Sequence, residues 1–238
     1  MRIVLSYVIQ IRTKPIWFLT CLFFSELCVY VYYKYIHSRY SSKIKITLVL
    51  FAVVIGAIYY KYVKIALPYN IDLCLVSVPI MIIGSYINKI KIMDKLVEFS
   101  RFQNFLVGTL LMIIALSLNF VNVKINKMEN GIDLFSSSFG FYFVFMLSAI
   151  LSCASIFIIS YSIRSCRIFE YIGKNSLTIF AIHSIPIVFL RRFFNYNIVT
   201  FNWKTILIMI VVFFISIIIT VFINEVFMRT PIKKVLGK

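Results

Sequence analysis

A histidine close to a proline inside an apolar segment is the most distinctive chemical feature of the sequence. The run NSLTIFAIHSIP places His183 three residues before Pro186. Because proline cannot donate to the carbonyl of Ile182, the helix is expected to loosen here and to open onto a cavity lined by protein. Ionisable groups within membrane segments are usually functional, so His183 is a candidate general base that orients or deprotonates a hydroxyl group. An equally weighted interpretation is a hydrogen bond from His183 to a neighbouring helix that holds the structure together.

The start of the same segment is a candidate anion contact. Lys174, Asn175 and Ser176 stand where an apolar helix should begin, and Asn175 or Ser176 can act as its N-cap. Free amide groups at a helix N-terminus, together with a lysine, attract phosphate. The favoured alternative is an ordinary capped helix start beside a loop lysine.

A few other polar residues lie in or beside apolar segments. Glu26 is within the first of them and is a second catalytic candidate, since a carboxylate that faces lipid is costly. Asp72 and Glu225 lie at segment ends, where they are expected to reach the interface, and Arg191 and Arg192 are expected to extend outward.

Metal and disulfide chemistry have no support in the sequence. The cysteines have no metal-ligand spacing and lie in or beside apolar segments, so they are interpreted as free packing residues. They are Cys21, Cys28, Cys74, Cys153 and Cys166.

The composition is that of a polytopic membrane protein. Hydrophobic residues make up 62% of the 238, charged residues only 14%, and the mean hydropathy is +0.97. Soluble domains contain about a quarter charged residues. The net charge of +17 would suggest nucleic acid in a soluble chain, but here the cations lie in short loops between apolar segments. A nucleic-acid partner is therefore not expected, and membrane lipids are.

Seven apolar segments are long enough, or nearly so, to cross a bilayer, which takes about 20 residues. The predicted fold is an all-α transmembrane helix bundle that forms a single membrane domain over residues 1–238. The segments run from Trp17 to Tyr33, Ile46 to Val63, Ile71 to Ile87, Phe102 to Val121, Phe139 to Ile163, Ser176 to Leu190 and Thr205 to Asn224.

Three stretches, in order, resemble acyltransferase family 3, the integral-membrane acyltransferases of bacterial surface glycans. The first is the helix opening from Lys14 to Phe23. The second runs from Leu67 to Asp72 and is followed by Gly84, and the third, YIGKNSL from Tyr171 with His183, is the most specific. The resemblance extends over roughly residues 14–225.

The resemblance implies a function in the bacterial inner membrane. Since the chain resembles this family, it is expected to move an acetyl or other acyl group from acyl-CoA onto a sugar hydroxyl of a lipid-linked or surface polysaccharide. The resemblance implies that acyl-CoA, expected to be acetyl-CoA, is the donor substrate. Its phosphates are expected to contact Lys174, Asn175 and Ser176. The resemblance also implies a glycan or lipid-linked sugar as acceptor, with His183 or Glu26 acting in the transfer.

Family members usually have about ten helices, with a proposed catalytic histidine in the first. The expectation is that this chain corresponds to the part from about the fourth helix, is inactive alone, and has the remaining N-terminal half as a separate partner chain. Two alternatives stay open: a non-catalytic membrane subunit or gene remnant that packs against another chain, and a polysaccharide polymerase or transporter-like protein.

The distribution of cations predicts the orientation in the membrane. Seven spans place the two termini on opposite sides, and the loops on the side of the C-terminus contain more Lys and Arg. Since cytoplasmic loops carry the excess of these residues, the N-terminus is predicted outside and the C-terminus in the cytoplasm. An alkaline phosphatase fused after Lys238 should be inactive. Phosphatase activity at that position would reverse the orientation.

Overall fold

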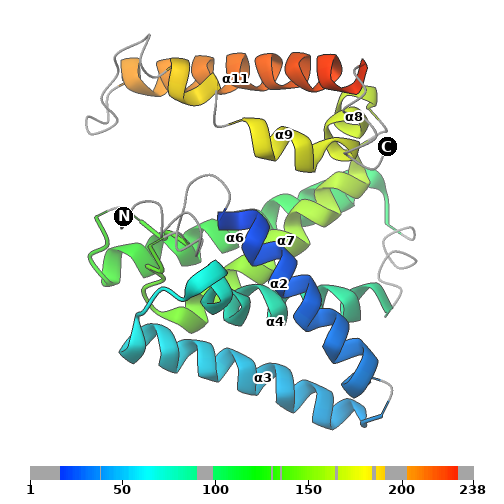
Figure 1. Cartoon of the computed structure of the whole chain (residues 1–238), viewed down its shortest axis with the longest axis vertical. Helices are drawn as coiled ribbons and strands as arrows, with labels where there is room; N and C mark the ends of the chain where they lie inside the picture. The colour runs from blue at the N-terminus through cyan, green and yellow to red at the C-terminus, as the bar shows by residue number, and fades with distance from the viewer. Residues whose placement is uncertain are drawn as a thin grey trace. The chain divides into compact units, whose positions relative to one another are not determined.

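The computed structural model describes residues 17–37, 39–89, 99–129, 131–134, 136–163, 166–183, 186–190 and 203–229. Within these ranges the chain is helical apart from short connections, and its only β-type pairing is an isolated bridge between Asp133 and Ser138. The all-α prediction is confirmed. The chain divides into two compact units, Met1–Arg164 and Ser165–Lys238, and each is described by itself (Figure 1).

In the described part of the first unit there are five long or medium helices and three short helical turns. The long helix α6 starts at a capping box: the Ser100 hydroxyl accepts from the Gln103 N–H at 3.2 Å, and the Gln103 side chain accepts from the Ser100 N–H at 2.8 Å. The elements are α2 (Trp17–Val31), η1 (Tyr32–His37), α3 (Ser42–Ile58), η2 (Tyr59–Val63), η3 (Pro68–Leu73), α4 (Cys74–Lys89), α6 (Arg101–Ile125) and α7 (Tyr142–Ser162).

Five described helical stretches are long and apolar enough to cross a membrane. They coincide with five of the predicted spans, and many of their large apolar side chains are exposed, as a lipid-facing surface requires. The five are Ser42–Val63, Pro68–Ile87, Arg101–Ile125, Tyr142–Ser162 and Leu207–Val226. The predicted spans that begin at Trp17 and Ser176, and hence the total of seven, stay predictions.

A buried asparagine fixes the turn that precedes α4. Tyr69 and Asn70 both have left-handed backbone angles, with φ of 57° and 58°. The fully buried Asn70 amide donates to the Thr20 hydroxyl at 2.9 Å and to the Trp17 carbonyl at 3.3 Å, which ties this turn to α2. Asparagine tolerates the left-handed region better than most residues, so the side chain that makes the contact also suits the backbone.

Helices α6 and α7 pack closely through small and polar side chains. The buried Ser155 hydroxyl on α7 donates to the Gly108 carbonyl on α6 at 2.7 Å. A Cβ at Gly108 would lie only 2.7 Å from a side-chain carbon of Ile159. Further along, Ser148 donates to Asn119 at 2.6 Å. Small residues that allow close backbone approach, with a few hydrogen bonds, are how helices associate in lipid.

The connection into α7 is held by one buried side chain. The Asn122 amide donates to the Phe139 carbonyl at 2.9 Å, while its oxygen accepts from the Phe141 N–H at 2.8 Å. Between them, Gly140 has a φ of +61°, and a Cβ there would lie 2.6 Å from the Asn122 oxygen and 2.9 Å from the Asn126 nitrogen. The turn therefore needs glycine for both its backbone angle and its space.

The second unit contains α8 (Arg167–Lys174), α9 (Ser176–Ile182), a helical turn at 186–190 and the long helix α11 (Trp203–Arg229). The apolar helix α11 carries a buried polar stripe at intervals of four residues, formed by Ser216, Thr220 and Asn224. Because residues four apart share one helix face, this stripe marks the side of α11 that faces protein.

The turn at Gly140 allows a matched test of packing. Gly140→Ala should lower thermal stability more than Gly131→Ala, because both residues have positive φ but only Gly140 is enclosed, whereas nothing lies within 4 Å of a Cβ at Gly131. The left-handed cost is about 1–2 kcal/mol for each, and overpacking adds about 1–3 kcal/mol at Gly140. Thermal unfolding in detergent measures the difference. Equal losses would contradict the enclosed turn.

Candidate functional site

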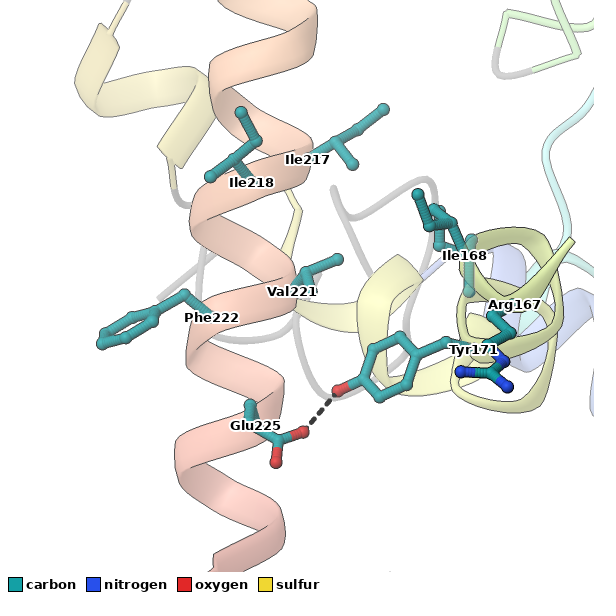
Figure 2. A pocket seen from close by; sticks show the side chains of 9 residues that line it. Arg167, Ile168, Tyr171, Ile217, Ile218, Val221, Phe222 and Glu225 are labelled. Atoms are coloured by element: carbon teal, nitrogen blue, oxygen red, sulfur yellow. Dashed lines mark hydrogen bonds between the residues drawn. The ribbon is translucent and has the colours of Figure 1, made fainter.

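The second unit contains a pocket between α8 and α11, which we call the α8–α11 pocket. Its volume is about 630 Å³, within the range of ligand sites. Most of the wall is aliphatic, and the polar groups are Arg167, Tyr171 and Glu225 (Figure 2). The apolar lining residues are Ile168, Ile172, Ile217, Ile218, Val221 and Phe222.

The Tyr171 hydroxyl lies at the centre of the polar contacts. It donates to the Glu225 carboxylate at 2.9 Å and accepts from the Asn224 amide at 2.9 Å. Figure 2 shows the ring reaching from α8 toward α11, with the hydroxyl directed at Glu225. A hydroxyl that both donates and accepts has a fixed orientation, so these contacts hold α8 against the C-terminal part of α11.

Asn224 is the least satisfied polar residue in this cluster. Its side chain is fully buried, and its Oδ1 atom has no hydrogen-bond partner among the described residues. A buried amide oxygen without a partner costs on the order of 1–3 kcal/mol. Asn224 does not line the α8–α11 pocket, so this unpaired oxygen lies behind the pocket wall, next to the Tyr171 hydroxyl that its own amide nitrogen binds.

The surroundings favour the neutral form of the tyrosine. Burial raises the pKa of Tyr171 above its ordinary value, and the Glu225 carboxylate raises it further, while the Asn224 amide acts in the opposite direction. The raised pKa means that the contribution of Tyr171 to stability is present below its unfolded pKa, about 10. This contribution is lost as the pH rises through the higher folded value. At neutral pH Tyr171 is a hydrogen-bond donor.

The predicted phosphate contacts lie at the corner between α8 and α9. Asn175 is the N-cap of α9, as expected, but its side chain does not cap the helix; the amide donates to the Tyr171 carbonyl at 2.9 Å. Lys174 and Ser176 are exposed, and α9 has only seven residues. The structure brings the three residues together, and their contact with acyl-CoA stays a prediction.

His183 is found at the predicted interruption of the helix. Helix α9 ends at Ile182, and His183 is its half-buried C-cap. The ring nitrogen Nδ1 lies within hydrogen-bond distance of the Phe180 carbonyl, and the His183 and Phe180 rings are 5.1 Å apart. When Nδ1 donates in this contact, Nε2 is the nitrogen that can accept a proton. The catalytic role of His183 stays a prediction.

The other candidates have different surroundings. Glu26 belongs to the first unit and is on the exposed side of α2, one residue after the fully buried Ser25; its catalytic role also stays a prediction. Asp72 does not reach the interface as expected. Its side chain is buried, and its carboxylate accepts from the Leu67 N–H at 3.2 Å, because it closes the turn before α4. Arg191 and Arg192 lie outside the described residues.

Comparison with protein families identifies the chain. The family model described as "Acyltransferase domain", that of acyltransferase family 3, matches residues 8–225. The chain belongs to acyltransferase family 3. The resemblance stated from the sequence is thereby confirmed, and the protein is a membrane protein of the acyltransferase type. Comparison with curated proteins and with solved structures finds no match.

The sequence pointed to the α8–α11 pocket only in part. Tyr171 belongs to the most specific motif, yet its role there became clear only from the contact with Glu225, 54 residues later. One signal was present: the predicted topology places the loop before Ser176 and the C-terminal end of the last span on the same side of the membrane. A tyrosine and a carboxylate at these two positions were therefore candidates for a pair.

The Tyr171–Glu225 contact can be measured with a double-mutant cycle. Tyr171→Phe and Glu225→Ala, which remove the donor and the acceptor, should each lower thermal stability at pH 7, and the double variant should lose less than their sum. The coupling is expected near the membrane-protein range of about 0.6–1.7 kcal/mol. Tyr62→Phe, at a side chain that is 71% exposed, is the matched control and should change little. Additive losses would contradict the hydrogen bond.

Proposed function

We propose that this protein is a bacterial inner-membrane O-acyltransferase that moves an acyl group from acyl-CoA onto a sugar hydroxyl of a cell-surface or lipid-linked polysaccharide. The observation that carries the proposal is the family match over residues 8–225. The resemblance implies acetyl-CoA as donor, so O-acetylation is the specific reaction proposed.

The α8–α11 pocket supports a donor site. Its aliphatic wall suits an acyl chain or the pantetheine arm, and Arg167, Lys174 and Ser176 are positive or hydrogen-bonding groups on α8 and at the start of α9. Phosphates of acyl-CoA would be bound by Arg167 and Lys174 as charge partners. The predicted orientation places this end in the cytoplasm, where acyl-CoA is made.

In the proposed reaction His183 acts as general base. Its Nε2 takes the proton of the acceptor hydroxyl as the oxygen attacks the thioester carbonyl. The bond between the carbonyl carbon and sulfur then breaks, and the protonated His183 gives its proton to the leaving sulfur, so that CoA leaves as the thiol. A general base of this kind contributes about 10²–10⁴-fold to the rate. Glu26 is the second candidate for this role.

The proposal includes a partner chain, because the resemblance implies a catalytic histidine on a family helix to which no stretch of this sequence is similar. A chain that supplies that helix would complete the site. A non-catalytic membrane subunit that packs against such a chain is the alternative function. An assay of acyl transfer separates the enzyme from the subunit.

Acyl transfer by the protein tests the proposal directly. Membranes that contain the chain together with a family N-terminal half should transfer label from [¹⁴C]acetyl-CoA to the glycan fraction, and the chain alone should not. His183→Ala should lower the rate about 10²–10⁴-fold, since the general base is lost, without lowering the amount of protein in the membrane.

Two controls decide between chemistry and packing. Protein abundance should be unchanged, because the hydrogen bond of His183 is local, to the Phe180 carbonyl of its own helix, and loss of one such bond costs only about 0.5–1.5 kcal/mol. Near-full turnover of His183→Ala would assign the histidine to the scaffold and make Glu26→Gln the next variant. No transfer under any condition would favour the non-catalytic subunit.

A further inference from the structure

A second pocket lies in the first unit, and it shares no lining residue with the α8–α11 pocket. It has a volume of about 540 Å³ and is formed by η2, the connection from α6 and the beginning of α7. We call it the α6–α7 loop pocket. Its walls combine aromatic rings, amide and hydroxyl groups, and two lysines, Lys61 and Lys64. This mixture differs from the aliphatic α8–α11 pocket and suggests a polar ligand with flat apolar faces.

The floor of this pocket is rigid before any ligand binds. Tyr60 and Tyr142 are buried and stacked with ring centroids 5.6 Å apart. The Tyr60 hydroxyl donates to the Asp72 carbonyl at 2.7 Å, and the Tyr142 hydroxyl donates to the Leu75 carbonyl at 3.0 Å. Binding to a surface that is already ordered avoids the entropic cost of ordering it.

The rim offers the groups that bind a sugar. Phe141 and Phe143 line the pocket and expose 52% and 57% of their surface, so their rings are available to the C–H faces of a pyranose. Asn126, Ser137 and Ser138 supply amide and hydroxyl groups on the same rim. The Asn122 contacts and Gly140 hold this loop in place.

The charge of the pocket selects an anion. Among the described residues that line it, two are lysines and none is acidic. The nearest carboxylates of the connecting loop, Glu129 and Asp133, are not part of the lining, and the Asp133 carboxylate accepts from the Ser136 N–H in its own turn. Lysine binds carboxylate or phosphate as a compact point charge, without the fixed geometry of arginine.

We propose that the α6–α7 loop pocket binds a negatively charged saccharide. This inference does not rest on the proposed function. Lys61 and Lys64 pair with the sugar's carboxylate or phosphate, Phe141 and Phe143 contact its ring, and the Asn126 and serine side chains bind its hydroxyls. In the predicted orientation this pocket opens to the outside, where surface glycans are found.

Direct binding tests the pocket without any catalytic assay. The purified full chain in nanodiscs of neutral lipid is titrated with a galacturonic acid trisaccharide and with the neutral galactose trisaccharide, and binding is followed by microscale thermophoresis. The acidic sugar should bind more tightly, and its affinity should fall with added salt, since salt screens exposed charges. Equal affinity for the two sugars, or binding of neither, would overturn the proposal.

A matched pair of double variants locates the site. Lys61→Gln with Lys64→Gln should weaken binding of the acidic trisaccharide by about tenfold or more, the size expected for losing two partly exposed ion contacts. Lys124→Gln with Lys127→Gln removes the same charge from a neighbouring stretch that does not line the pocket, and should change affinity less than twofold. Lys64 and Lys127 both have left-handed backbones, with φ of 51° and 49°, so the backbone effect is matched too. Equal losses in the two variants would overturn the site.

Two further arms test the source of the anion and the role of the aromatic rim. Nanodiscs that contain phosphatidylglycerol test whether a lipid headgroup occupies the pocket instead; loss of binding of both trisaccharides in them would overturn the saccharide assignment. Phe141→Ala should weaken both sugars without changing the salt dependence, and unchanged affinity for both would contradict contact between this ring and the sugar.

Discussion

The absence of water from the hydrocarbon region is the constraint on which the rest of this structure depends. A polar group buried there has to find a partner within the protein, since an unpaired one costs several kcal/mol. Asn122 and Asn70 meet this requirement by binding backbone groups that lie far away in the sequence, and Ser155 does so across α6 and α7. Because the apolar side chains have no preference between lipid and protein, these few polar contacts determine which helix faces meet.

The same requirement connects structure to function within each unit. In the second unit, Tyr171 pairs with Glu225 and Asn224, but the Asn224 Oδ1 atom stays without a partner among the described residues. In the first unit the polar groups of the α6–α7 loop pocket lie at the ends of spans, where an aqueous ligand can reach them. Polar groups near the middle of the helices are used for packing, and those at the ends are available for binding.

The sequence predicted the fold class and five spans because these depend on composition alone. Runs such as Tyr142–Ser162 are apolar over their whole length, and only a membrane accommodates them. It also predicted a loosened helix near Ile182, where α9 ends, since the effect of Pro186 is local. It could not predict the partner of Tyr171 or the burial of Asp72, because both depend on which helices meet. Which helices meet depends on small residues such as Gly108, and the sequence alone does not show that Gly108 packs against Ile159.

The family motif contains residues with a structural role as well as candidate catalytic residues. Within YIGKNSL, Tyr171 holds α8 against α11 through its hydroxyl, and its carbonyl accepts from the Asn175 amide at the corner into α9. That corner sets where α9 begins, and seven residues later the helix ends beside His183. A substitution at Tyr171 would remove the hydroxyl contacts with α11, while the carbonyl that Asn175 binds would stay in place. Loss of activity in such a variant would fit a displaced α8 as well as lost chemistry, so it would not by itself make Tyr171 a catalytic residue.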